Sequence, residues 1–360
     1  MNILDNPTQM QQLDKQNVYQ SLVDLPKQCQ HAWDEAQKIS LPANYKQVNK
    51  IVMAGMGGSG LGARIIESVY GLNLKQPLVR INDYDLPSWA DEKTLVICSS
   101  FSGTTEEIVS ISKQAQTKNC PWLAISAGGT IIELVKKHHR PFYRINPVYN
   151  PSKQPRMAIG YSVVGQLVMA HKAGLINFTA QRLQALIDTI EKTLQNTTID
   201  LPANQNPAKK LASKFYEKAV VFVAARHMTG GLHTVKNQMN ENSKNFSVRF
   251  DVPEMNHHLM EGLLHPQSNP KHLLFFLISS QLYPPRISQR MTITQQVVKK
   301  NKINTVLWQA SAKDKLSQVF ELIQFVGMAN FYLSMLYKIN PAEIPWVDYF
   351  KTKLGQPLGK

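Results

Sequence analysis

The chain has 360 residues, of which 43% are hydrophobic and 18% charged, a composition typical of a folded globular protein and not of a disordered one. This length is enough for two domains that each bury a core. Forty basic against 25 acidic side chains give a net charge of +15, but the charge is spread along the chain in short clusters such as VKKHHR and VVKKNK. No basic arm and no aromatic-interleaved basic stripe is present, so we expect solvated helix ends and no nucleic-acid partner.

The sequence also favours the cytoplasm over a membrane or a secreted location. The first residues, MNILDNPTQMQQLDKQ, lack the basic and apolar regions of a signal peptide, and no run of 18 apolar residues is present. Three scattered cysteines, Cys29, Cys98 and Cys120, are typical of a reducing compartment.

The first half of the chain alternates between apolar strands and amphipathic helices. After a helical segment at 10–40, strands are predicted at 50–55, 77–82, 94–100, 121–126 and 142–146, with helices at 61–71, 104–118 and 130–138 between them. Such alternation predicts a parallel sheet with helices on both faces.

The second half repeats this pattern after a proline-rich break at 146–157. One long helix is predicted at 160–195, followed by strands at 219–226, 246–252, 272–280 and 303–308 and a long amphipathic helix at 317–339. The predicted fold class is therefore α/β with two subdomains, each a parallel sheet flanked by helices.

Two loops at strand ends carry the chemistry-bearing residues. AGMGGSGLG follows the first strand, with five glycines that let the backbone approach a ligand and with Ser59 as a hydroxyl. SSFSGTTEE follows the third strand and supplies five hydroxyls in seven residues. Ser and Thr before Glu also fit a simple capping box. A dinucleotide site stays open as well, since Asp83 and Asp85 follow the second strand. A terminal phosphate fits this many hydroxyls better, because each can donate to the dianion beside a helix N-terminus.

The loops GMGGSGLG and SSFSGTTEE resemble the phosphate-binding loops of sugar isomerase (SIS) domains. Four further stretches, QPRMAIGYS, KNQMNENSK, PEMNHHLMEG and VDYFKTKLG, resemble in order and spacing the motifs of the bifunctional phosphoglucose/phosphomannose isomerases. The resemblance implies four parts: an N-terminal helical segment (1–45), a first SIS subdomain (46–150), a linker with connecting helices (151–205), and a second SIS subdomain with C-terminal helices (206–360).

The resemblance also implies a role for each matched residue. The phosphate would be held by Gly58, Ser59, Ser100, Ser102 and Thr105. Glu241 would be the base that moves a proton between C2 and C1, and Arg156 would stabilise the enediolate. His257, contributed by the neighbouring subunit of a homodimer with shared active sites, would assist ring opening, and Lys351 would contact the sugar.

Each assignment has an ordinary alternative. Glu241 and Lys351 could be solvated helix residues, Arg156 an interdomain ion-pair partner, and His257 a structural histidine. The family usually has Asn-His-Asn where this chain has NHH, so His258 could alter its neighbour. Adjacent histidines point in different directions and would not share a metal, so neither a metal nor another cofactor is expected.

The function predicted is an aldose–ketose isomerase for glucose 6-phosphate and mannose 6-phosphate, with a phosphorylated hexose as its partner. One alternative is a non-catalytic phosphosugar sensor, which would leave NENSK and PEMNHH unexplained. Another is a sugar-phosphate amide-transfer partner, which would need a nucleophilic cysteine near the N-terminus, where none precedes Cys29.

Overall fold

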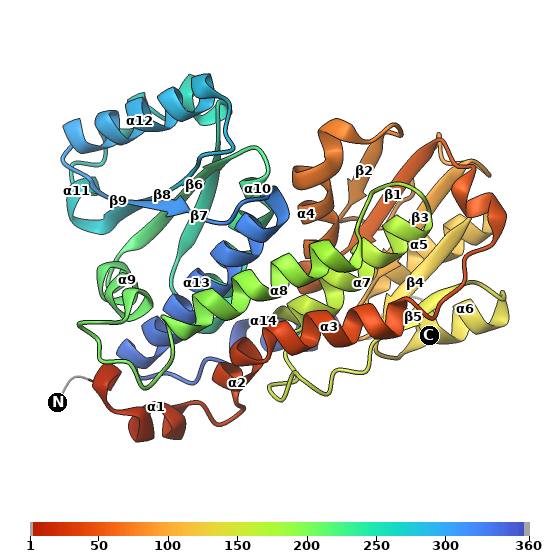
Figure 1. Ribbon diagram of the computed structural model, residues 1–360, viewed down its shortest axis with the longest axis horizontal. Coiled ribbons are helices and arrows are strands. Elements are labelled where there is room, and N and C mark those ends of the chain that lie inside the picture. Colours follow the sequence, from red (N-terminus) through yellow and green to blue (C-terminus); the bar gives the residue numbers. More distant parts are fainter. Residues whose placement is uncertain (1–2, 356–360) are drawn as a thin grey trace. The chain divides into compact units, whose positions relative to one another are not determined.

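The computed structural model describes residues 3–355, which divide into two compact units (Figure 1). The first-sheet unit contains Val23–Ile187 and the segment from Ile344 onward, and the second-sheet unit contains the residues up to Leu22 and Asp188–Glu343. The sequence predicts boundaries between SIS-type subdomains and linker at residues 45, 150 and 205, and these boundaries remain predictions.

The first sheet contains five parallel strands in the order β2-β1-β3-β4-β5. They are β1 (Lys50–Gly55), β2 (Leu78–Ile81), β3 (Thr94–Ser99), β4 (Trp122–Ser126) and β5 (Phe142–Arg144). The chain leaves β1 toward one side of the sheet and returns to β3 on the other, so the switch point lies between these two strands. Gly55 pairs with Ser99 in the register, which brings the loops after β1 and β3 together at one edge.

Helices cover both faces of the first sheet (Figure 1). One face carries α4 (Leu61–Tyr70) and α7 (Ile159–Lys172), with α3 (Leu25–Ala36) packed on α7, and the other carries α5 (Glu106–Thr117) and α6 (Thr130–Lys137). Val52, Val96 and Trp122 of the strands meet Ile111 and Val135 of α5 and α6 in a buried core. The near-continuous apolar strands are typical of a sheet buried on both faces.

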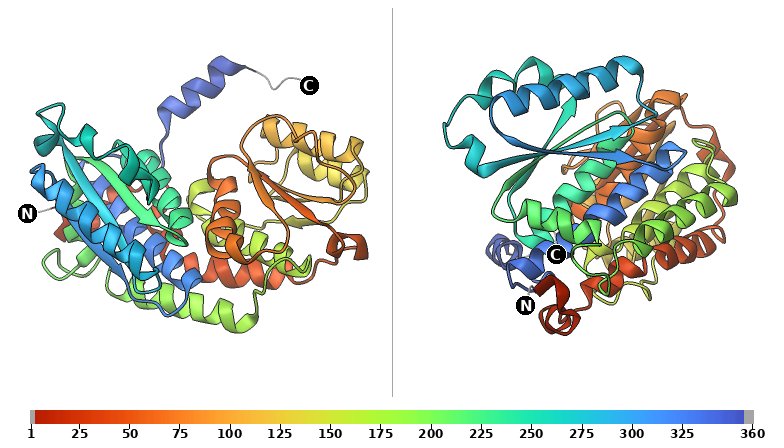
Figure 2. Two further views of the ribbon diagram at one scale, coloured as in Figure 1. Left: turned by 90° about the horizontal axis from the view of Figure 1, so that it is seen from above. Right: turned by 60° about the vertical axis from the view of Figure 1, so that its left-hand side comes forward.

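The second sheet contains four parallel strands in the order β7-β6-β8-β9. They are β6 (Ala219–Ala225), β7 (Ser247–Val252), β8 (Leu273–Ser280) and β9 (Asn304–Ala310). Figure 2 shows α12 (Pro285–Lys300) on one face, while α10 (Met228–Gln238) and α13 (Lys315–Leu336) cover the other. The predicted α/β class with two parallel sheets is therefore confirmed.

The remaining helices connect or flank these layers. They are α1 (Pro7–Leu13), α2 (Val18–Val23), α8 (Ala180–Gln195), α9 (Pro207–Phe215), α11 (Asn269–His272) and α14 (Pro345–Leu354).

The single helix predicted at 160–195 is wrong, because the structure divides this stretch into α7 and α8. Gly174 adopts φ +75°, a left-handed conformation that ends a helix and that glycine adopts without strain. Phe178 N then donates to His171 Nδ1 (3.4 Å), which closes the turn before α8 begins.

By length and composition, α13 is apolar enough to cross a membrane, but 89% of its most apolar window is buried inside the protein. Burial of this kind is typical of a core helix. Within residues 3–355 it is the one helix of that length and hydropathy.

Candidate active site

The glycine turn after β1 is a short 3-10 helix, Gly57–Gly60, that leads into α4. Gly57 adopts φ +48°, and a Cβ built on it would meet nothing within 4 Å. Gly55 and Gly60 instead face each other, since a Cβ on Gly60 would lie 2.6 Å from the Gly55 carbonyl oxygen. The expectation that all five glycines serve a ligand is therefore wrong: several of them make room for the protein's own atoms.

The hydroxyl-rich loop after β3 is cross-linked by its own side chains. Ser100 Oγ lies 2.8 Å from Thr105 Oγ1 and accepts a hydrogen bond from Gly103 N (3.0 Å). Ser100 is only 1% exposed. Ser102 is exposed, and its Oγ accepts from Thr104 N (3.3 Å). Ser102 accepts and keeps its own proton to donate. In the Ser100–Thr105 pair one hydroxyl donates to the other, so one proton of the pair stays available.

The predicted capping box is not formed. Thr105 is the N-cap of α5, but its side chain makes no cap hydrogen bond to the helix. Its hydroxyl pairs with Ser100 instead, while Glu106 accepts from Tyr84 OH (2.5 Å). The Ser and Thr residues before α5 therefore build the loop itself.

The two loops are joined directly. Phe101 N, in the second loop, donates to Ser59 Oγ in the first (2.8 Å), and Ser59 is 8% exposed. Gly103, at φ +73°, fits tightly under the Gly128 carbonyl, and its own carbonyl accepts from Ile131 N (3.0 Å). The hydroxyls are thus held on a backbone that is fixed from two sides.

Arg156 lies beside the glycine turn. It belongs to a 3-10 segment, Pro155–Met157, and is 3% exposed, with Nη1 donating to Gln154 Oε1 (2.8 Å). A Cβ on Gly58 would lie 3.1 Å from Arg156 N, so the two segments touch. The structure therefore brings Arg156 together with Gly58 and the loop hydroxyls in the first-sheet unit.

Gln28 holds the segment that carries Arg156. Its Nε2 donates to Tyr149 O (3.0 Å) and Met157 O (3.1 Å), and its Oε1 accepts from Gly160 N (3.2 Å). This buried carboxamide on α3 is more than 100 residues away in sequence, so no local motif indicates its part in the site.

Glu241 lies in the second-sheet unit, on a π-helical turn, Met239–Ser243, that continues α10. Such turns are rare and often occur at functional sites. Asn240 fixes the turn, because its Oδ1 accepts from Ser247 N (2.9 Å) and Ser247 Oγ (2.8 Å). Glu241 is partly exposed.

His257 ends a 3-10 segment, Glu254–His257, of the same unit and is exposed. The preceding Asn256 donates to Thr294 Oγ1 of α12 (2.8 Å), which anchors the segment. His258 is exposed too, with its ring 6.0 Å from the ring of Phe250. Lys351 is exposed on α14, a helix in which no residue is buried.

The corresponding edge of the second sheet is filled by side chains. Tyr283, 5% exposed, accepts from Ala225 N (3.1 Å) and donates to Ile278 O (3.2 Å), and the ring of His227 packs edge-on against it at 5.5 Å. His227 Nε2 is 2.8 Å from Gln318 Oε1, which also accepts from Ser280 Oγ (2.6 Å). Burial lowers the pKa of His227 below its ordinary value, so the ring is neutral at pH 7.

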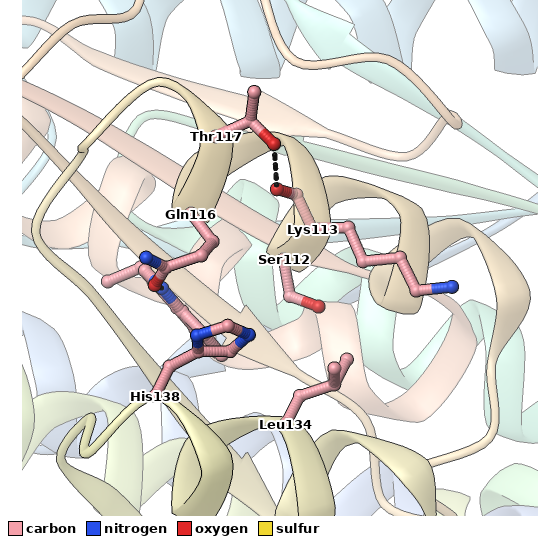
Figure 3. A pocket seen from close by; sticks show the side chains of 7 residues that line it. Ser112, Lys113, Gln116, Thr117, Leu134 and His138 are labelled. Carbon is pink, nitrogen blue, oxygen red and sulfur yellow. Dashed lines mark hydrogen bonds between the residues drawn. The ribbon is translucent and has the colours of Figure 1, made fainter.

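A pocket of about 200 Å³ lies elsewhere, between α5 and α6 of the first-sheet unit (Figure 3). Its lining includes Lys113, Leu134 and His138 but none of the predicted site residues. It lies where these helices end, away from the carboxyl ends of the strands.

His, Cys, Asp and Glu side chains are the groups that could hold a metal ion, and cysteines could also act as nucleophiles. Residues 3–355 contain no group of three or more His, Cys, Asp or Glu side chains that could hold a metal ion. All three cysteines are buried, and burial raises the pKa of the Cys120 thiol to about 11. A thiol of that kind is a poor nucleophile.

Known proteins resemble this chain in both sequence and fold. Residues 204–354 match the family described as "Bacterial phospho-glucose isomerase C-terminal SIS domain". A protein of Caldicellulosiruptor bescii named "Bifunctional phosphoglucose/phosphomannose isomerase" is 29% identical over 347 residues, which cover 94% of this chain and 99% of that protein. Tagatose-6-phosphate ketose/aldose isomerase from Escherichia coli has a similar fold, with a TM-score of 0.69 at 12% identity over 90% of this chain and 94% of that one. Protein TT0462 from Thermus thermophilus aligns with a TM-score of 0.73 at 16% identity, covering 99% and 92% of the two chains.

Two parallel sheets, with a glycine-rich and a hydroxyl-rich loop at the switch point of the first, give this chain a fold similar to that of these solved proteins. In sequence, residues 204–354 are similar to a phosphoglucose isomerase SIS domain, and nearly the whole chain is similar to a bifunctional phosphoglucose/phosphomannose isomerase. The resemblance predicted from the sequence motifs is confirmed.

Proposed function

We propose that this protein is an aldose–ketose isomerase that interconverts glucose 6-phosphate and mannose 6-phosphate with fructose 6-phosphate. The observation that carries the proposal is the pair of joined loops at the switch point of the first sheet, which hold Ser59, Ser100 and Thr105 beside the backbone of Arg156. The names of the sequence relatives support the same reaction.

The loops would bind the phosphate group of the sugar. Ser59 and Ser100 accept hydrogen bonds from backbone amides. The Ser59 proton can then point to a phosphate oxygen, and so can the Ser100 proton when Thr105 donates to Ser100. Ser102 and the Gly58 backbone complete the set, and the N-terminus of α5 adds a favourable dipole. Charge-assisted bonds of this kind are stronger than neutral ones.

Glu241 would act as the base in the isomerisation. Its carboxylate takes the proton from C2 of the open-chain aldose, the electrons of the C2–H bond form the C1–C2 double bond of the enediolate, and the same carboxyl returns the proton to C1. The hydroxyl proton of O2 moves to O1, which leaves the ketose carbonyl at C2. Oxidation at C2 and reduction at C1 balance within the substrate, so no redox partner is consumed. Arg156 would stabilise the negative enediolate oxygen, because a fixed cation stabilises charge that develops there.

His257 would move the ring-oxygen proton when the sugar opens, since an imidazole titrates near neutral pH. Lys351 would contact the sugar. The mechanism calls for neither a metal nor another cofactor.

We also propose a homodimer with shared active sites. Helix α14 exposes Trp346 (81%), Tyr349 and Phe350, and none of its residues is buried. A ten-residue helix is marginal in water unless it packs against another surface, and a second copy of this chain would supply one. The buried, unpaired cysteines support a cytoplasmic location.

The direct test is to add glucose 6-phosphate, and separately mannose 6-phosphate, to the purified protein in the presence of EDTA and to measure fructose 6-phosphate. Turnover of either sugar supports the isomerase. Tight binding of both without turnover would refute it and favour the sensor.

A further inference from the structure

We propose that Gln166 is a positioning residue that couples the two phosphate-binding loops of the first sheet. It lies on α7 and is 1% exposed. The inference rests on the proposed function, because it concerns the affinity of the same loops for phosphate.

The carboxamide of Gln166 joins both loops at once. Its Nε2 donates to Ser59 O in the first loop (3.0 Å) and lies 3.2 Å from Ser99 Oγ, at the end of β3. Because a backbone carbonyl can only accept, the amide nitrogen has to face Ser59. Ser162, one turn earlier on α7, donates to Gly58 O (3.4 Å), so the helix supports two successive residues of the turn.

Gly62 makes room for this carboxamide. A Cβ on Gly62 would lie 2.5 Å from Gln166 Cδ and 2.6 Å from Nε2, too close for any real contact. This glycine was expected to admit a ligand, but the space beside it is filled by Gln166. The pair Gly62–Gln166 is therefore one structural unit, although 104 positions separate the two residues in the sequence.

The second sheet has an equivalent buried glutamine but no loop predicted to bind phosphate. Gln318 of α13 bonds to His227 after β6 and to Ser280 at the end of β8, much as Gln166 bonds to Ser59 after β1 and to Ser99 at the end of β3. There the edge is occupied by Tyr283. Gln318 thus provides a matched control for a glutamine that only stabilises the fold.

The experiment compares Gln166→Met with Gln318→Met. Binding of inorganic phosphate is measured by calorimetry, and KM and kcat are measured with glucose 6-phosphate. We expect Q166M to raise the Kd of phosphate and the KM about tenfold, as the loss of one positioning hydrogen bond would, with kcat changed less than threefold. Q318M should lower the melting temperature and leave the Kd of phosphate unchanged.

Further variants separate the effect of positioning from the effect on stability. Gln166→Glu keeps the volume of the side chain, but its carboxylate repels Ser59 O and can donate only once it is protonated. Its Kd for phosphate, relative to wild type at the same pH, should therefore fall as the pH is lowered. In Gly62→Ala/Gln166→Ala, the new methyl group occupies the vacated space, so the melting temperature should recover relative to Gly62→Ala while the Kd stays as high as in Gln166→Ala.

Unchanged phosphate affinity in Q166M, or in Q166E should Q166M not fold, would overturn the proposal. Wild-type protein that binds no phosphate would overturn it too. If phosphate affinity changes as expected but the wild type isomerises no sugar, the proposed function alone is wrong.

Discussion

Removing the hydroxyls of Ser100 and Ser102 should weaken phosphate binding far more than it weakens the fold. A hydrogen bond to a charged group contributes about 1.5–3 kcal/mol, and the exposed Ser102 belongs at the lower end because water can replace it. The two losses together are about 3–4.5 kcal/mol, so Ser100→Ala/Ser102→Ala should raise KM for glucose 6-phosphate by about 10²–10³-fold. The fold should lose only about 1 kcal/mol, because Gly103 N keeps a second acceptor, Ser100 O, at 3.2 Å.

The assay is the initial rate of fructose 6-phosphate formation over a range of substrate concentrations, with urea unfolding of the same samples. Ser112→Ala is the matched control, since this buried serine of α5 donates only to Val109 O of its own helix (2.8 Å). It should leave KM unchanged. If the double variant is folded and its KM stays within twofold of wild type, these hydroxyls do not bind the phosphate.

Three more predictions concern the base, metals and pH. Glu241→Gln should lower kcat by about 10²–10⁴-fold for both glucose 6-phosphate and mannose 6-phosphate and abolish C2-deuterium exchange. If this variant still turned over either epimer at the wild-type rate, a mechanism with a single base would be excluded. Dialysis against a chelator should leave activity intact; a loss that zinc restores would contradict the metal-free mechanism. Burial lowers the pKa of His227 in the folded protein, so as the pH falls the unfolded chain takes up this proton at a higher pH than the folded one does. The free energy of unfolding should therefore decrease below about pH 6.5, by up to ~1.4 kcal/mol per pH unit. The urea midpoints at pH 7 and pH 5.5 should differ less in His227→Gln than in the wild type. An equal difference in the two proteins would show that His227 does not cause the loss of stability.

The order of strands and helices could be read from the sequence because each buried strand is a short apolar run between turns. All nine strands of residues 3–355 lie within or close to predicted ranges. The helix at 160–195 was wrong because the apolar pattern continues through the turn at Gly174. Only the backbone conformation there, stabilised by the contact of Phe178 with His171, shows that the helix ends.

The candidate site was predictable where its residues are close in sequence. The run from Ser99 to Thr105 is visible as a cluster of hydroxyls, and a strand before it fixes its place at the sheet edge. Gln28 and Gln166 were not predictable, since nothing in the sequence around a glutamine shows that its side chain is buried and bonded to distant segments. Their partners lie on segments 67 to 132 residues away.

The two sheets show how the same topology can lead to different sites. The switch point lies between β1 and β3 in the first sheet and between β6 and β8 in the second, and at both a buried glutamine from a later helix joins the two strand ends. In the first sheet the two strand ends lead into glycine- and serine-rich loops, for which we propose an anion; in the second, the rings of Tyr283 and His227 occupy the corresponding edge. The backbone thus provides the same position twice, and the side chains around the two positions differ. For this reason the loops after β1 and β3, and not the fold that the two units share, carry the functional argument.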